Sequence, residues 1–116
     1  MRLLMCGSRE WKKTWPVYGV IIALAPDVVI EGDARGADRL SGYIAKNSGI
    51  AVETYPAHWD RYGKGAGPKR NQQMIAEGKP DLVVAFSEDI ANSVGTSDML
   101  CRAENEGIPY FLVDGD

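Results

Sequence analysis

The sequence predicts a single α/β domain in which a five-stranded parallel sheet lies between two layers of helices. Short apolar runs rich in β-branched residues alternate with longer stretches of helical spacing, as in a strand–helix–strand fold. The short runs are hydrophobic almost without interruption, which is typical of strands covered by helices on both faces. A chain of 116 residues, 45% of them hydrophobic, is enough for one core. We therefore treat residues 1–116 as one domain.

The elements follow one another regularly along the chain. The expected strands are Leu3–Cys6, Val28–Glu31, Ile50–Thr54, Leu82–Phe86 and Tyr110–Val113. The expected helices are Trp15–Ala25, Ala37–Ser48, Lys69–Glu77 and Ser97–Glu106. Glycines at 49, 78 and 107 end the last three helices and precede the next strand by a few residues. We expect the strand order 3-2-1-4-5 with right-handed crossovers, because only this order brings the loops after strands one, two and four together.

One segment departs from this alternation. Tyr55–Pro68 contains three glycines, two prolines and three aromatic residues, and we expect a long loop that borders the ligand site and closes over it as a lid. The single histidine, His58, lies in this segment without a partner at catalytic or metal-ligating spacing, and is interpreted as a neutral loop residue.

Composition excludes several classes of protein. With 13 basic and 16 acidic residues the formal net charge is −3, which makes DNA an unlikely partner. The longest apolar run, Val17–Ala25, is far too short to span a bilayer, and the first residues lack the pattern of a signal peptide. Two cysteines 95 positions apart suit neither a disulfide framework nor a zinc site. We expect a cytoplasmic protein without membrane, metal or cofactor.

The loops after three of the expected strands carry the chemistry. They begin at Gly7, Gly32 and Ser87, and all contain glycine and small polar residues. In an open α/β sheet these loops meet at the carboxyl ends of the strands, where glycines let the backbone approach a ligand and helix N-termini offer N–H donors. Arg9 and Arg35 add forked donors suited to phosphate or carboxylate. The pattern predicts an anion-binding site, with phosphate as the commonest anion.

Each part of this pattern also has a structural interpretation. Any parallel α/β protein needs glycine turns, and neither G-x-G-x-x-G nor a Walker A loop is present. Glu88 and Asp89 would repel a phosphate, which makes the third loop the weakest part of the pattern. The aromatic residues Trp11, Trp59 and Tyr62 lie in glycine-rich segments, where they either anchor a loop or stack on a planar ligand such as a nucleobase.

Four ordered motifs resemble one known family along nearly the whole chain. They are Gly7-Ser8-Arg9-x-Trp11, Glu31-Gly32-Asp33-Ala34-Arg35-Gly36-Ala37-Asp38-Arg39, Ala66-Gly67-Pro68-x-Arg70-Asn71-x-x-Met74 and Gly95-Thr96-x-Asp98-Met99. The sequence is similar to the YpsA-related branch of the SLOG superfamily, which is named for its DNA-processing DprA and cytokinin-activating LOG members. The resemblance implies a Rossmann-like fold and a nucleotide or nucleotide-derived ligand. It also implies a link to nucleotide signalling or phage conflict.

Residue by residue, the resemblance carries over only in part. Arg70 matches an arginine of the LOG enzymes, whereas Asn71 stands where they have lysine, and Gly95 and Thr96 match the end of their glycine-rich loop. LOG enzymes are phosphoribohydrolases, and the position of their catalytic glutamate is Met99 here, with Asp98 one residue earlier. The paired glycines of their loop are replaced by the longer segment Ser87–Val94.

The leading hypothesis is therefore a sensor or sequestering module for a small molecule such as AMP, ADP-ribose or an NAD-like compound. One alternative is a phosphoribohydrolase in which Asp98 or Asp38 is the catalytic carboxylate, and a second is a DprA-like DNA-processing accessory. Homo-oligomerisation is left open. The expected ligand-binding residues are Gly7, Ser8, Arg9, Trp11, Gly32, Asp33, Arg35, Gly36, Ala37, Asp38, Trp59, Arg70, Asn71, Gly95 and Thr96.

Overall fold

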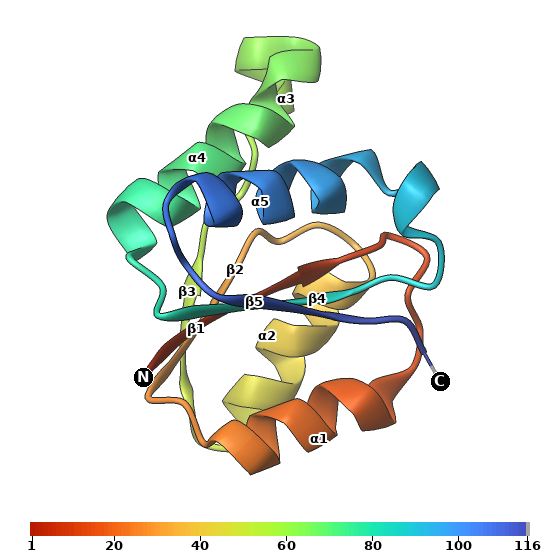
Figure 1. The fold of residues 1–116 in the computed structure, drawn as a ribbon. Coiled ribbons are helices and arrows are strands. Elements are labelled where there is room, and N and C mark those ends of the chain that lie inside the picture. Colours follow the sequence, from red (N-terminus) through yellow and green to blue (C-terminus); the bar gives the residue numbers. More distant parts are fainter. Residues whose placement is uncertain (116) are drawn as a thin grey trace.

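The computed structural model describes residues 1–115, which form a three-layer α/β fold around one parallel sheet (Figure 1). The strands are β1 (Arg2–Gly7), β2 (Val28–Glu31), β3 (Ala51–Thr54), β4 (Leu82–Phe86) and β5 (Tyr110–Val113). All neighbouring strands pair in parallel in the order β3-β2-β1-β4-β5. The fold class and the strand order predicted from the sequence are both confirmed.

Two helices cover each face of the sheet (Figure 1). Helices α1 (Thr14–Leu24) and α2 (Ala37–Asn47) lie on one face, and α4 (Ala66–Gly78) and α5 (Val94–Asn105) lie on the other. The short helix α3 (Trp59–Tyr62) projects beyond the amino end of α4. Among the helices of residues 1–115, none combines the length and the apolar composition that crossing a bilayer requires.

The segment Tyr55–Pro68 is not the long loop that its composition predicts. Only residues 55–58 are irregular, because α3 is followed directly by a 3-10 turn (Gly63–Gly65) and by the start of α4. The backbone N–H groups of Arg61 and Tyr62 both donate to the carbonyl oxygen of His58, which closes the first turn. Gly67 lies so close to the Trp59 ring that an added Cβ would be 3.3 Å from it, so the glycine lets this turn fold against α4.

Each face of the sheet has its own apolar core. The α1/α2 side contains Val17, Ile21, Val84 and Phe86, and the α4/α5 side contains residues such as Met74 and Met99. Since successive side chains of a strand point to opposite faces, both cores draw on the same apolar strands. This is the physical reason for the uninterrupted hydrophobic runs in the sequence.

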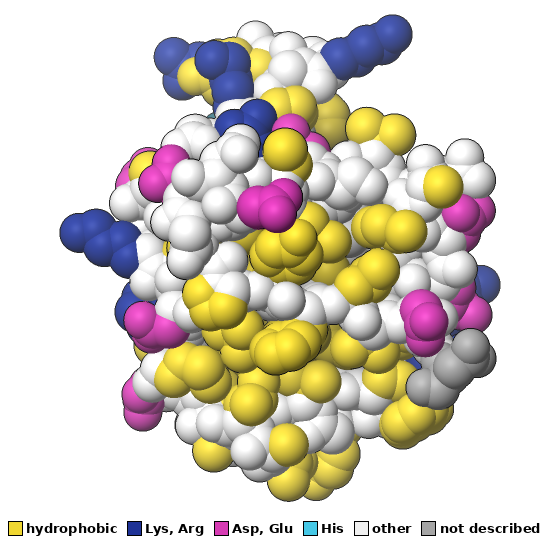
Figure 2. Space-filling model, viewed as in Figure 1, with side chains coloured by type: hydrophobic (Ala, Val, Ile, Leu, Met, Phe, Trp, Pro, Cys, Tyr) yellow, Lys and Arg dark blue, Asp and Glu magenta, His cyan; other side chains and the backbone are white. Residues whose placement is uncertain are grey.

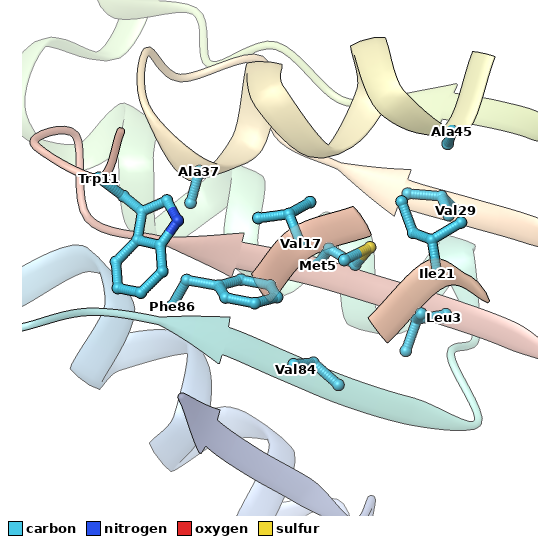
Figure 3. Close-up of a cluster of buried hydrophobic side chains, with 10 residues drawn as sticks. All are labelled: Leu3, Met5, Trp11, Val17, Ile21, Val29, Ala37, Ala45, Val84 and Phe86. Atoms are coloured by element: carbon cyan, nitrogen blue, oxygen red, sulfur yellow. The ribbon is translucent and has the colours of Figure 1, made fainter. Parts of the chain in front are cut away.

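Trp11 belongs to the first of these cores and not to a ligand site (Figure 3). Its side chain is only 2% exposed, its ring lies 5.5 Å from that of Phe86, and its Nε1–H donates to the carbonyl oxygen of Lys13 at 2.8 Å. The expectation that Trp11 contacts ligand therefore has no support in this structure. The ring anchors the turn after β1, which is the other interpretation that the sequence allowed.

Candidate functional site

The loops that follow β1 and β2 meet the amino ends of α4 and α5 in a cleft with two lobes. The arginine lobe has a volume of about 440 Å³, and the lobe beside α5, called the α5 lobe below, has a volume of about 510 Å³. Both volumes are in the range of small-molecule sites. The arginine lobe is lined by Arg9, Gly32, Asp33, Ala34, Arg35, Arg39, Pro56, Ala57, Trp59 and Arg70. The α5 lobe includes Gly7, Ser8, Arg9, Asp38, Trp59, Lys64, Arg70, Asn71, Met74, Gly95, Thr96, Asp98 and Met99.

Four arginines line the arginine lobe, from the β1 turn, the β2 turn, α2 and α4. Two of them are held by surface ion pairs: Arg35 contacts Glu10 at 2.8 Å, and Arg39 contacts Asp33 at 3.3 Å. Both pairs are largely exposed, so solvent screens them and they contribute little to stability. An incoming anion can therefore compete with Glu10 and Asp33 for these guanidinium groups.

Arg9 and Trp59 stand where the two lobes adjoin. The guanidinium carbon of Arg9 lies 5.4 Å from the centre of the Trp59 ring, which is cation–π distance. Both residues line both lobes, and the indole is 47% exposed. An exposed indole beside a guanidinium group can stack on a planar base while the cation contacts a phosphate.

Arg70 connects the two lobes through a network of hydrogen bonds. One of its terminal nitrogens donates to the carbonyl oxygen of Gly32, and its Nε–H donates to the Asn71 side-chain oxygen at 3.0 Å. The Asn71 amide in turn donates to the Gly95 carbonyl oxygen at 3.2 Å and to an Asp98 carboxylate oxygen at 2.9 Å. This network fixes the β2 turn, α4 and the start of α5 relative to one another.

Asp38 is the buried carboxyl group of the cleft. It is 4% exposed and lines the α5 lobe, where the Ala34 N–H points at it at 3.4 Å. Burial raises the pKa of Asp38 to about 7, although the nearby Arg70 cation opposes the shift. Burial likewise raises the pKa of Glu31, which accepts hydrogen bonds from the Thr54 hydroxyl at 2.6 Å and the Asp33 N–H at 2.7 Å. Asp38 can therefore exchange a proton near neutral pH, whereas Glu31 shapes the turn after β2.

Asp98 lies in the cleft but is committed to other partners. The same carboxylate oxygen accepts hydrogen bonds from Arg102 at 2.8 Å and from Asn71. Met99 is buried and lines the α5 lobe. Of the two candidate catalytic carboxylates, Asp38 is the buried one, and its raised pKa suits it to proton transfer near neutral pH.

Several expected binding residues support the site through contacts within the protein. The carbonyl oxygen of Ser8 accepts hydrogen bonds from Trp11 N–H at 3.2 Å and Ala37 N–H at 3.1 Å, and the Ser8 hydroxyl accepts one from the Glu10 N–H. The first N–H of α2 is thereby used inside the protein. Gly36 has a φ of +82°, and an added Cβ would lie 2.3 Å from the Ser8 carbonyl oxygen. Gly36 and Ala37 thus join the β1 turn to α2 and do not line either lobe.

The segment Ser87–Val94 folds into a compact turn that includes a 3-10 helix (Ile90–Asn92). Helix α5 starts at Val94, three residues earlier than expected, so Gly95 and Thr96 form its first turn rather than a loop before it. The Thr96 hydroxyl is buried and accepts a hydrogen bond from the Ser93 hydroxyl at 2.9 Å. Gly95 and Thr96 both line the α5 lobe.

Sequence reasoning missed some lining residues. Arg39 belongs to the second motif and lies in the first turn of α2, close in sequence to Arg35, and its place beside the β2 turn could have indicated that it lines the same lobe. Lys64 and Met74 also line the α5 lobe, although neither was among the expected binding residues: Lys64 lies in the segment expected to border the site, and Met74 ends the third motif.

A comparison with protein-family profiles found no match. In fold, the chain is similar to DNA processing protein A (DprA) from Streptococcus pneumoniae, with a TM-score of 0.79 and 21% identity. That likeness covers 99% of this chain but 50% of the DprA chain, so this chain spans half of the DprA structure it matches. In sequence, the chain is 35% identical to the Gene 61 protein of Mycobacterium phage D29 over 123 aligned positions, with 95% of this chain and 94% of the phage protein covered. The chain belongs to the family of this phage protein.

Proposed function

We propose that the two-lobed cleft binds a nucleotide or nucleotide-derived molecule and that the protein acts as a sensor or sequestering module for it. The observation that carries this proposal is the set of four arginines lining one lobe beside the half-exposed Trp59 ring. Phosphate suits forked guanidinium donors, and a base suits an indole face. The arginine lobe would hold phosphate groups, and Trp59 would contact the base.

Two further lines of support come from the chain's relatives. The Rossmann-like fold shared with DprA agrees with membership of the SLOG superfamily, and the four sequence motifs favour its YpsA-related branch. The 35% identity to a phage protein fits the expected link to phage conflict or nucleotide signalling.

Isothermal calorimetry with AMP, ADP-ribose, NAD and inorganic phosphate tests the proposal. We expect at least one nucleotide to bind more tightly than phosphate, because the α5 lobe and Trp59 add contacts that phosphate cannot make. A single-stranded oligonucleotide belongs in the same series, since the DprA name refers to DNA processing. Salt-dependent binding of the oligonucleotide with no binding of the small nucleotides would favour the DNA-processing alternative.

Arg35→Ala is expected to weaken binding of that nucleotide by about 1.5–3 kcal/mol, the range for a hydrogen bond to a charged group. Thermal stability should change little, because Arg35 is exposed and its pair with Glu10 is screened. Lys46→Ala, which removes an exposed cation at the far end of α2, is the matched control and should bind normally. Unchanged affinity in Arg35→Ala would place the phosphate elsewhere.

Trp59 should report on ligand directly. Its ring lies at cation–π distance from Arg9 and lines both lobes, so a ligand that enters either lobe changes its surroundings. We expect a saturable change in tryptophan emission that is absent in Trp59→Phe, where the buried Trp11 and the distant Trp15 remain. A signal of equal size in both proteins would show that α3 is not part of the binding site.

A phosphoribohydrolase is the second candidate function. Its catalytic carboxylate would be the buried Asp38 rather than Asp98, which is held by Arg102. We expect at most very slow release of base from AMP, because an uncharged thioether occupies the position of the LOG carboxylate. Chromatography of the wild-type, Asp38→Asn and Asp98→Asn proteins tests this. Robust turnover in the wild type that disappears in Asp38→Asn would replace the binding role with the enzymatic one.

A further inference from the structure

The outer side of α1 is apolar where a surface helix is normally polar. The helix contains no charged residue between Thr14 and Leu24. Val17 and Ile21 are buried against the sheet, whereas Trp15, Tyr18 and Ile22 are between 53% and 65% exposed. These three residues are three or four positions apart and form one stripe. A helix that is apolar all round is normally covered on both sides.

The edge strand β5 is also uncovered. Tyr110, Phe111 and Leu112 are all exposed, with Phe111 at 62%. The carbonyl oxygens of Pro109 and Val113 accept hydrogen bonds from β4. Because the bonding direction alternates along a strand, the main-chain groups of Tyr110 and Leu112 point away from β4. The strand has none of the charged side chains that usually protect a sheet edge.

The α1 stripe and β5 lie on one face of the molecule. Phe111 pairs with Val84, which belongs to the core under α1, and so Phe111 emerges on the α1 side of the sheet. Figure 2, viewed onto the β5 edge, shows hydrophobic side chains gathered over β5 and down across α1, while most Lys and Arg side chains lie around the periphery. Tyr110 and Leu112 pair with Val83 and Ala85 of the other core and point to the α4/α5 side of the sheet, but they lie on the same exposed edge. The dimer face therefore consists of this edge and the α1 stripe, that is Trp15, Tyr18, Ile22, Tyr110, Phe111 and Leu112.

We propose that this face binds a second copy of the same chain, β5 edge against β5 edge in antiparallel pairing about a two-fold axis. Such an axis, perpendicular to the sheet, places both α1 helices on the same side of the joined sheet, with the two Phe111 side chains between them. Each copy then supplies the same strand edge and the same apolar stripe, as a two-fold interface requires. The two sheets become one sheet with both β5 edges covered.

The exposed apolar area matches what a dimer needs. Large apolar side chains present roughly 200 Å² each when fully exposed. The six side chains of the face are between 38% and 65% exposed, so together they present on the order of 600 Å² to solvent. A standard interface takes about 800 Å² from each partner, somewhat more than half of it apolar. An apolar patch of about 600 Å² is at the upper end of what monomeric proteins expose, and patches of this size often mark interaction sites. The proposal is independent of what the cleft binds.

Sedimentation velocity over a range of concentrations tests the proposal. The wild-type protein is expected to sediment with twice the chain mass of 12.7 kDa. Phe111→Glu should dissociate it, raising the dimer dissociation constant by about 30-fold or more, because two buried carboxylates would oppose each other. Tyr43→Glu, at a comparably exposed aromatic residue on α2, is the matched control and should remain dimeric.

Leu112→Pro tests the strand pairing at the β5 edge. Proline removes only the N–H that points away from β4, so the internal ladder survives while pairing to another strand is lost. We expect this variant to be monomeric with a near-normal melting temperature. The proposal would be overturned if the wild-type protein stays monomeric over a 100-fold range of concentration. A dimer that persists in Phe111→Glu or Leu112→Pro would also overturn it.

Discussion

Replacing Asp38 with asparagine is expected to remove a loss of stability that the wild-type protein shows as pH rises. Burial raises the pKa of Asp38 from 3.8 to about 7. Between these values the folded chain keeps the proton that the unfolded chain releases, so the contribution of Asp38 is fully present below pH 4. This stabilising contribution is lost as pH rises towards 7, and the total loss in the free energy of unfolding is about 4 kcal/mol. Asparagine keeps an acceptor for the Ala34 N–H and does not titrate.

Urea unfolding of both proteins at pH 5 and pH 8 measures this effect. Asp27 and Glu53 have lowered pKa values, through hydrogen bonds from the N-terminal amine and Arg2 respectively, and contribute stability that grows with pH. They are present in both proteins, so their contributions cancel in the difference. We expect Asp38→Asn to gain stability relative to wild type between pH 5 and pH 8. A difference that stays constant would mean that Asp38 does not change its ionisation in this range.

Gly36→Ala should be strongly destabilising, although alanine adds only one methyl group. Gly36 has a φ of +82°, and an added Cβ would meet the Ser8 carbonyl oxygen at 2.3 Å and the backbone of Arg9 at 2.7 Å. Neither contact is a flexible side chain, so the β1 turn or the start of α2 must move. Strain and overpacking together cost roughly 3–5 kcal/mol.

Thermal and urea unfolding check this expectation, with Gly19→Ala as control. Gly19 lies in α1 with open space around its Cβ position, and alanine there should raise stability by up to about 1 kcal/mol. A loss below about 1 kcal/mol in Gly36→Ala would mean that the junction between the β1 turn and α2 is softer than its geometry indicates.

The sheet was predictable because its signal is local. Runs such as Leu3–Cys6 and Leu82–Phe86 are apolar on both faces. The glycine-containing loops after strands one, two and four could meet only if these strands are neighbours, which predicted the strand order. Residues 59–68 were not predictable from composition, because glycine here fits a tight helical turn against Trp59 instead of a mobile loop. The early start of α5 depends on the 3-10 turn before it, whose backbone bonds leave no pattern in the sequence.

The candidate site was predictable in its location and less so in its roles. The sequence indicated that Arg9, Arg35 and Arg70 converge, and the structure places all three in the arginine lobe. Trp11 has glycine-containing surroundings similar to those of Trp59, yet only tertiary packing decides that the former is buried and the latter exposed. The burial of Asp38 likewise depends on neighbours from other elements, whereas Asp98 and Arg102 pair four residues apart on α5, a spacing that the sequence shows.

A crystal structure of the protein soaked with AMP and with ADP-ribose tests the central claim most directly. The proposed function predicts phosphate oxygens within hydrogen-bond distance of Arg9 or Arg70 in the arginine lobe, and a base against the Trp59 ring. It also predicts that the Arg9–Trp59 contact opens or shifts to admit the ligand. A cleft that stays empty at saturating nucleotide, or a nucleotide bound only outside both lobes, would contradict it.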